Sequence, residues 1–251
     1  METALGIDVG GSGVKGALVD LDKGEFTTDR YRIETPQPAT PEAVADVIGQ
    51  IVEHFNVGDD VPVGVCFPAP LPGGVVPYMA NLDQGWVGKN VAEFIGDRIG
   101  RKVYALNDAD AAGLAEMRHG VGKDRSEGVV LFTTLGTGIG SALFINGQLV
   151  PNTELGHLEI DGHDAEKRAA ASIRTKEDLS WKKYIKRLQR YYEVTVDLFS
   201  PDLIVVGGGI SRKHDKFLPH LKLRSEIVPA ELRNTAGIVG AATYAHEQAQ
   251  A

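Results

Sequence analysis

The stretch ALGIDVGGSGVKGALV, residues Ala4–Val19, consists of an apolar run, a cluster of glycines and a second apolar run. The G-x-G-x-x-G spacing of dinucleotide-binding folds is met by Gly11, Gly13 and Gly16. In a Rossmann fold a helix follows the glycines directly, but here Val14–Val19 is typical of a strand and runs into the turn-forming Asp20–Gly24. The stretch therefore predicts two strands joined by a glycine turn and excludes a Rossmann fold.

A glycine turn between two strands can bind phosphate through its backbone amides, because residues without a Cβ let a ligand approach closely. The candidate amide donors are Gly10, Gly11 and Gly13. Ser12 adds a hydroxyl and Lys15 adds a cation, while Asp8 at the strand end can hold a hydrated Mg²⁺. The alternative is a tight hairpin that binds no ligand.

The order strand, glycine loop, strand, helix, strand occurs twice, which predicts two similar α/β domains with a cleft between them. The first half is expected to hold strands at 4–9, 14–19, 26–33, 63–67 and 103–106, and helices that begin at Pro41, with Thr40 as N-cap, and at Ala109. The second half is expected to hold strands at 129–134, 141–145 and 203–206, a hairpin turn at Asn146-Gly147 and helices at 181–199 and 236–248. The expected division is a small domain of residues 1–106, joined by a C-terminal helix at 235–251, and a large domain of residues 107–234.

The chain has 251 residues, of which 43% are hydrophobic and 24% charged, and a net charge of −8. This composition is typical of a soluble globular protein, and the acidic balance disfavours nucleic-acid binding. No apolar run is long enough to span a membrane, and no signal peptide opens the sequence. Cys66 is the only cysteine, so we expect no intrachain disulfide, no cysteine-rich zinc site and a reducing, cytoplasmic location.

Basic residues are concentrated in one segment of this acidic chain. Residues 166–224 hold 14 lysines and arginines against seven acidic residues. One face of the predicted helix at 181–199 carries Lys182, Lys183, Lys186, Arg187 and Arg190. An extended anion bound along this cationic stripe would release counterions, as nucleic acids do. The alternative is an ordinary solvated helix face.

Two further groups of polar residues follow predicted strands. Asn107 and Asp108 end one strand, at the edge where ligands meet open α/β sheets. A carboxylate there can accept the proton of a hydroxyl that attacks phosphorus, although capping of the next helix is an equal alternative. Glu154 and His157 follow a hairpin and can hydrogen-bond the hydroxyls of a sugar.

Five motifs occur in the order found in the repressor/ORF/kinase (ROK) family of sugar kinases, which the chain resembles over nearly its whole length. They are Asp8-x-Gly-Gly-Ser-x-x-Lys15, Asn107-Asp108-Ala-Asp-Ala-Ala112, Leu135-Gly-Thr-Gly-Ile-Gly140, Glu154-x-Gly-His157 and Gly207-Gly-Gly209. The resemblance implies the two-domain actin-like, ribonuclease H-like fold. The stretches TPQPATP (35–41), PNTELGHLE (151–159), GGGISRK (207–213) and NTAGIVGAA (234–242) are similar to the polyphosphate glucokinase branch of the family.

This resemblance implies an enzyme that moves the terminal phosphate of inorganic polyphosphate, and in some members of ATP, to the 6-hydroxyl of glucose. Asp108 is implied as the general base. The implied sugar contacts are Asn81, Asn107, Asp108, Glu154 and His157. The implied donor contacts are Gly10, Gly11, Ser12, Gly13, Lys15, Gly136, Thr137, Gly138 and Gly208, with Lys182 and Lys186 along the polyphosphate chain. The implied cofactor is Mg²⁺, held by Asp8.

The chain departs from most of the family at one place. Other members follow the Gly-His motif with a cysteine cluster that binds structural zinc, whereas this chain has Asp161-Gly162-His163-Asp164. The polyphosphate branch also lacks those cysteines, so the resemblance implies no zinc. A further sugar-binding glutamate follows the cluster in the family, and Glu159 and Glu166 are the candidates here. Family members are often homodimers, so a homodimer is expected, with no nucleic-acid or membrane partner.

Alternatives from the same family are a strictly ATP-dependent glucokinase and an N-acetylmannosamine kinase. An alternative of another class is a non-catalytic sugar-sensing protein. The repressors of the family carry a helix-turn-helix before the first phosphate motif, whereas seven residues precede Asp8 here. This difference favours the enzyme.

Overall fold

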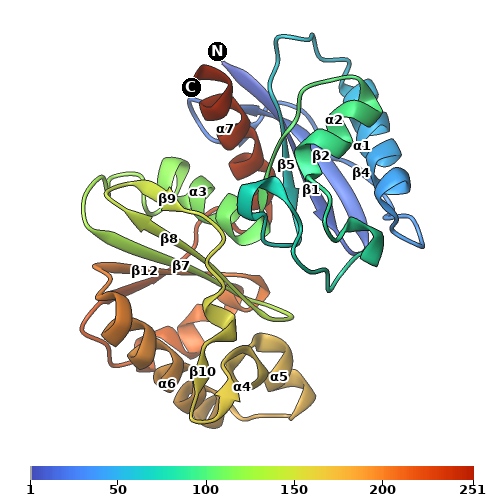
Figure 1. Cartoon of the computed structure of the whole chain (residues 1–251). Coiled ribbons are helices and arrows are strands. Elements are labelled where there is room, and N and C mark those ends of the chain that lie inside the picture. The colour runs from blue at the N-terminus through green and yellow to red at the C-terminus, as the bar shows by residue number, and fades with distance from the viewer. Residues whose placement is uncertain (1) are drawn as a thin grey trace. The chain divides into compact units, whose positions relative to one another are not determined.

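The computed structural model describes residues 2–251 and divides into two compact units (Figure 1). The first unit comprises the chain up to His119 together with Asn234–Ala251, and the second comprises Gly120–Arg233. The boundary therefore follows helix α3 (Asp108–His119), whereas we expected it before that helix. The reason is that α3 packs along the C-terminal helix α7 (Ala236–Gln250), which belongs to the first unit.

The first unit is built on one mixed sheet in the order β3-β2-β1-β5-β6. Its strands are β1 (Thr3–Gly10), β2 (Gly13–Asp20), β3 (Glu25–Phe26), β4 (Tyr31–Ile33), β5 (Val63–Phe67) and β6 (Tyr104–Asn107). Strands β1 and β2 form the predicted antiparallel hairpin, and β5 and β6 continue the sheet in parallel with β1. Parallel strands bring their carboxyl ends to one edge, where Asp8 and Asn107 lie.

Helices α1 (Pro41–Phe55), α2 (Val91–Ile99), α3 and α7 complete the first unit. Helix α1 begins as predicted, because the Thr40 side chain accepts a hydrogen bond from the backbone N–H of Ala43 at 3.3 Å. Helix α2 was not predicted, although its N-cap Asn90 and its left-handed C-cap Gly100 are strong boundary signals.

Glycines allow α7 to lie directly on the sheet. A Cβ on Gly6 of β1 or Gly64 of β5 would stand 1.9 or 1.8 Å from a carbonyl oxygen of α7. A Cβ on Gly240 of α7 would stand 1.8 Å from a carbonyl oxygen of α3. These backbone-to-backbone contacts explain why the last segment of the chain joins the first unit.

The second unit repeats the topology of the first around a sheet in the order β13-β12-β7-β8-β9. Its strands are β7 (Val129–Leu135), β8 (Ile139–Ile145), β9 (Gln148–Val150), β12 (Leu203–Gly207) and β13 (Glu226–Pro229), and a separate ribbon is formed by β10 (Glu159–Ile160) and β11 (His163–Asp164). Its helices are α4 (Glu166–Ala169), α5 (Ala171–Lys176) and α6 (Trp181–Phe199). The hairpin β7–β8 with its parallel neighbour β12 corresponds to β1–β2 with β5, so the predicted internal repeat is present.

One predicted strand is wrong. Residues 26–33 do not form a single strand but the two short strands β3 and β4. Between them the Thr28 hydroxyl accepts a hydrogen bond from the backbone N–H of Leu18 at 3.2 Å. This N–H therefore bonds to a side chain and not to the carbonyl oxygen of a paired strand. Short 3₁₀ turns complete the structure at Pro72–Gly74, Gln84–Trp86, Leu155–His157, Gly209–Lys216, Leu218–His220 and Arg233–Thr235. Over residues 2–251, no helix has the length and apolar character that a membrane crossing requires.

Candidate active site

The turn of the β1–β2 hairpin is Gly11-Ser12, and both residues are exposed. An arginine from β4 braces it: Nη2 of Arg32 donates a hydrogen bond to the Ser12 carbonyl oxygen at 2.7 Å. A Cβ on Gly13 would stand 2.6 Å from Nε of Arg32, so a side chain there would displace the guanidinium from its present position. Arg32 also lies opposite Lys15 in the β2–β4 register. The hairpin therefore presents two cations, of which the sequence motifs indicated only Lys15.

Asp8 and Lys15 face each other across the hairpin, with 3.4 Å between Lys15 Nζ and Asp8 Oδ2. The other oxygen, Oδ1, lies 3.6 Å from the Cys66 thiol of β5. Burial raises the pKa of Cys66 well above its ordinary value, so the thiol stays protonated and can donate this bond. Both members of the Asp8–Lys15 pair are partly exposed, which leaves the carboxylate accessible to a hydrated cation.

Of the two roles considered for Asn107 and Asp108, helix capping and a carboxylate open to substrate, each residue takes one. Oδ1 of Asn107 caps α3 by accepting hydrogen bonds from the backbone N–H groups of Ala109 at 2.8 Å and Asp110 at 3.2 Å. The Asp108 carboxylate accepts a hydrogen bond from the backbone N–H of Ala109 at 2.8 Å, and the residue remains exposed. Asn107 is thus the cap, and Asp108 is the carboxylate that a substrate can reach.

The surroundings of Asp108 favour its neutral form. Desolvation by crowded neighbouring atoms raises the pKa of Asp108 to about 6. The hydrogen bond from Ala109 opposes this shift, and the nearby negative charge of Asp8 adds to it. A carboxylate with a pKa near neutrality is suited to general-base catalysis, because it accepts a proton readily and is still largely charged at pH 7.

Asn81 lies beside the glycine hairpin. Its backbone oxygen is 3.7 Å from the position that a Cβ on Gly11 would occupy, and the residue is exposed. The loop around it is anchored by the fully buried Trp86 and by a hydrogen bond from Gln84 Nε2 to the Met79 carbonyl oxygen at 2.8 Å. The first unit therefore brings Asn81 to the predicted phosphate turn.

In the second unit the loop 136–138 joins β7 to β8 and is held from both sides. Ser172 Oγ donates to the Thr137 carbonyl oxygen at 2.6 Å, and Glu166 Oε2 accepts from the backbone N–H of Ile139 at 3.2 Å. Oε2 of Glu166 would also stand 2.3 Å from a Cβ on Gly138. Gly208 has a φ of 81° and packs on the Leu135 backbone. A Cβ on Gly208 would lie within 2.8 Å of three backbone atoms of Leu135. Gly208 is therefore required by its backbone conformation and contacts, whereas a side chain at position 138 would displace the Glu166 carboxylate.

A cavity of about 360 Å³ opens beside this loop. Its walls are the loop itself, helix α5, the start of α6 and the 3₁₀ segment after β12. The lining side chains and backbone belong to Leu135, Gly136, Thr137, Ala171, Ser172, Arg174, Thr175, Trp181, Gly209, Ile210 and Lys213. Its position beside Gly136 and Thr137 makes it the candidate donor side of the second unit.

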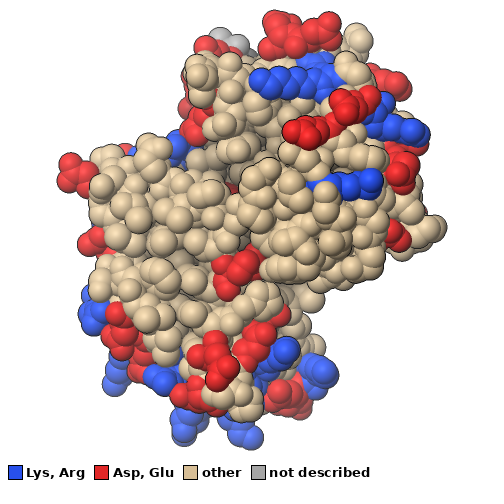
Figure 2. All heavy atoms as spheres, in the orientation of Figure 1, with Lys and Arg blue, Asp and Glu red and all other residues tan. Residues whose placement is uncertain are grey.

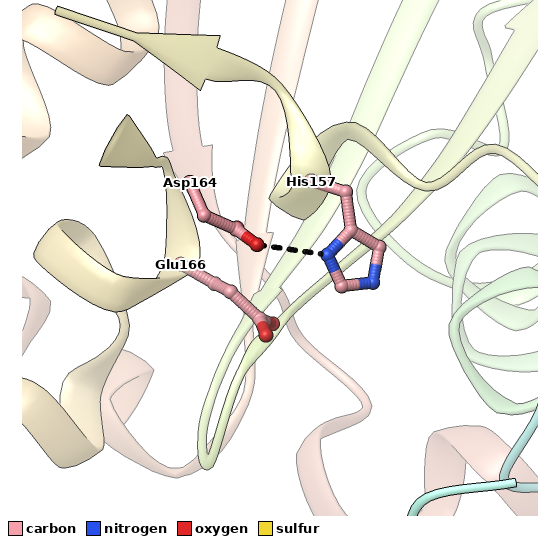
Figure 3. Close-up of side chains that lie close together, drawn as sticks. All are labelled: His157, Asp164 and Glu166. Carbon is pink, nitrogen blue, oxygen red and sulfur yellow. Dashed lines mark hydrogen bonds and ion pairs between the residues drawn. The ribbon is translucent and has the colours of Figure 1, made fainter. Parts of the chain in front are cut away.

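His157 lies at the centre of a second group of polar side chains (Figure 3). Its Nδ1 is 3.4 Å from Oδ2 of Asp164, and its Nε2 is 3.9 Å from Oε2 of Glu154. One ligand atom each of His157, Asp164 and Glu166 fall within 4.8 Å of one another. Such a group can orient the hydroxyls of a sugar or hold a cation. It contains Glu166 and not Glu159, and Asp164 had no sequence signal of its own.

The predicted cationic stripe lies on α6, whose opposite face buries Tyr184, Leu188, Tyr191 and Tyr192. Part of the stripe is neutralised, because Arg187 pairs with Glu177 at 2.6 Å and Arg190 pairs with Asp161 at 2.8 Å. Lys182, Lys183 and Lys186 are exposed. Figure 2 shows Lys and Arg side chains mixed with acidic ones over the end of the second unit where α4, α5 and α6 lie.

The sequence profile described as "ROK family" matches residues 4–172 of the chain. A polyphosphate glucokinase of Mycobacterium tuberculosis (strain CDC 1551 / Oshkosh) is 52% identical over 239 residues, covering 95% of this chain and 89% of that protein. The crystal structure of an inorganic polyphosphate/ATP-glucomannokinase from Arthrobacter sp. strain KM has a TM-score of 0.91 and 51% identity, covering 99% of this chain and 100% of that one. A ROK family glucokinase from Streptomyces griseus, solved with glucose and AMPPNP, shares the fold with a TM-score of 0.80 at 22% identity. The predicted sugar-kinase fold is confirmed.

Proposed function

This chain belongs to the ROK family, and from that membership we propose that it is a polyphosphate-dependent glucokinase. It transfers the terminal phosphate of inorganic polyphosphate to the 6-hydroxyl of glucose and forms glucose 6-phosphate. The similarity to polyphosphate glucokinases over 95% of the chain supports this assignment. Within the structure, the observation that carries it is the exposed Asp108 carboxylate with a pKa raised to about 6.

Asp108 accepts the proton of the sugar 6-hydroxyl as that oxygen attacks the terminal phosphorus. The new O–P bond forms while the bond from that phosphorus to the polyphosphate bridging oxygen breaks, and the shortened polyphosphate leaves. Asn107 supports this step by fixing the start of α3, from which the Asp108 side chain projects.

The remaining hydroxyls of glucose are assigned to polar side chains of each unit. In the first unit these are Asn81 and Asn107. In the second unit Glu154, His157 and Glu166 are assigned to the sugar, supported by the grouping of His157 with Glu154 and Glu166. Glu166 is preferred over Glu159 because only Glu166 belongs to that group.

The donor phosphates are assigned to the two glycine loops. In the first unit these are the amides of Gly10, Gly11 and Gly13, the Ser12 hydroxyl and Lys15. In the second unit they are Gly136, Thr137, Gly138 and Gly208. Backbone amides and fixed cations can stabilise the charge on the transferred phosphoryl group without having to reorganise during the reaction. Lys182 and Lys186 are assigned to the more distant phosphates of a long chain.

The proposed cofactor is Mg²⁺. Asp8 fits a hydrated Mg²⁺ because its carboxylate is partly exposed and its charge is close enough to raise the pKa of Asp108, so that a cation beside Asp8 would offset the charge of both groups. When bound, the ion neutralises charge on the donor phosphates. We further propose a cytoplasmic homodimer that requires no zinc and uses ATP as a secondary donor.

The test is product formation by the purified protein with glucose, Mg²⁺ and either long-chain polyphosphate or ATP as sole donor. ³¹P NMR identifies the product and the phosphorylated position. We expect glucose 6-phosphate from polyphosphate. Turnover with ATP alone would contradict the polyphosphate assignment. Turnover on N-acetylmannosamine in place of glucose would contradict the sugar assignment. No turnover with any combination of these donors and sugars would contradict the proposed function.

A further inference from the structure

Helix α5 places an arginine in the cavity beside the second glycine loop. Arg174 lines this cavity together with Thr137, Lys213 and Trp181. Its guanidinium carbon lies 4.0 Å from the centroid of the Trp181 ring, which is the geometry of a cation–π contact. The same helix begins next to Ser172, which holds the loop at Thr137, so Arg174 is fixed relative to the loop.

Arg174 has no counterion. Throughout residues 2–251, no carboxylate lies within 4.0 Å of its guanidinium, and its buried Nε has no hydrogen-bond partner. Two other arginines of the basic segment that line a pocket, Arg187 and Arg190, differ from it, since they are paired with Glu177 and Asp161. A buried guanidinium N–H without a partner is costly, and an anion is the ligand that would satisfy it.

Trp181 is the only aromatic side chain among the residues that line this cavity. A nucleotide base entering the cavity would need such a ring to stack on. One face of the Trp181 ring is covered by the Arg174 guanidinium, and Phe217 lies parallel to the ring at 6.1 Å between centroids. A base that stacks on the ring face beneath the guanidinium would have to displace Arg174, whereas a phosphate chain in the cavity would meet Arg174 and Lys213 directly.

We infer that Arg174 determines the choice of phosphate donor, by binding a phosphate of polyphosphate in this cavity and by denying the Trp181 ring to a nucleotide base. The inference rests on the proposed function and adds a residue for donor specificity to it. It involves binding alone, so Arg174 changes KM for the donor rather than the chemistry at the sugar. The glycine loops and Asp108 serve both donors equally.

The test compares kcat/KM for polyphosphate and for ATP in the wild type and in Arg174→Leu. We expect KM for polyphosphate to rise by about tenfold or more, while KM for ATP stays constant or falls and KM for glucose is unchanged. Arg174→Lys, which keeps the charge but loses the planar donors, should recover part of the affinity for polyphosphate. Arg125→Leu is the matched control, because Arg125 lies in the same unit, pairs with Glu226 at 2.6 Å and does not line the cavity.

Thermal unfolding of each variant verifies that it folds, and Arg174→Gln replaces the leucine variant if that one does not. A polyphosphate-to-ATP ratio that stays within about twofold of the wild type would overturn the inference. An equal loss with both donors would overturn it too, since Arg174 would then be a general phosphate contact. If the wild type phosphorylates glucose with neither donor, that result contradicts the proposed function. A wild type that is active, with variants whose donor ratio does not change, contradicts the assignment of Arg174 instead.

Discussion

The Asp108 carboxylate must be charged to accept a proton, yet its surroundings favour the neutral form. Desolvation and the neighbouring Asp8 both act against the charge, and the hydrogen bond from Ala109 only partly compensates. This balance gives the group a proton affinity close to that of a histidine. The result is a stronger base than an ordinary aspartate, placed at the first residue of α3, directly after β6.

The raised pKa of Asp108 predicts an acid limit to activity. Below about pH 6 most of the carboxyl is protonated and cannot accept a proton, so kcat/KM for glucose should be half-maximal near pH 6 and level off about one pH unit higher. The profile is measured at saturating polyphosphate and constant free Mg²⁺. An aspartate with the ordinary value of 3.8 would keep the enzyme active to a much lower pH, and an acid limb centred there would contradict the assignment.

Several site residues could be predicted individually and others could not. Asp8, Ser12 and Lys15 share one short motif, so the hairpin that aligns them is visible in the sequence. Arg32 reaches the same turn only because β4 pairs with β2, a contact between distant parts of the sequence that leaves no local pattern. Asp164 likewise meets His157 through the separate β10–β11 ribbon.

At the scale of elements, glycine contacts decide how α7 is placed. Gly240 faces the α3 backbone at a distance that excludes any side chain, whereas a Cβ on Gly237, one turn earlier, would make ordinary contacts of 3.4 Å with the Cys66 thiol. Alanine substitutions at Gly240 and Gly237 therefore distinguish the effect of a backbone clash on stability from the effect of helix propensity.

We predict that Gly240→Ala destabilises the protein by about 3 kcal/mol or more, because the helix must move off α3. Gly237→Ala should change the free energy of unfolding by about 1 kcal/mol or less, since alanine favours the helix and meets no clash. Chemical denaturation of the two variants measures the difference. Equal stabilities would show that α7 is not held by this backbone contact.

Most elements could be predicted, because their signals are local. Apolar periodicity and caps define α1 and α6, and the glycine loops define both hairpins. Helix α2 was overlooked although Asn90 and Gly100 mark its ends, since the preceding residues 68–90 have the composition of a loop. The break between β3 and β4 depends on a Thr28 contact that no local periodicity encodes.

Over the whole molecule, charge is distributed unevenly. A chain of net charge −8 keeps 14 basic residues within residues 166–224. The structure shows that Arg187 and Arg190 are already paired with acidic groups, whereas no ion pair is seen for Lys182, Lys183 or Lys186 within the described residues, so these lysines are the cations of the stripe that a polyanion would meet. Sequence counting alone could not separate paired from unpaired cations, because the partners Glu177 and Asp161 lie outside the helix.

We predict that the double substitution Lys182→Ala and Lys186→Ala raises KM for long-chain polyphosphate by about threefold to tenfold and leaves KM for glucose unchanged. Raising salt from about 50 to 200 mM should increase KM for polyphosphate in the wild type, and less steeply in the double variant. Lys222→Ala, an exposed lysine of the same unit, is the control. Identical salt dependence in all three proteins would show that the stripe is only a solvated helix face.

The central claim is that Asp108 takes the proton from glucose during phosphoryl transfer. Its most direct test is Asp108→Asn, which keeps the size and the bond to Ala109 but removes the base. Glucose affinity, measured by calorimetry, should stay within about threefold of the wild type, while kcat with polyphosphate falls by a factor on the order of 10² to 10⁴. An asparagine variant that binds glucose and turns over within about tenfold of the wild type would contradict the account.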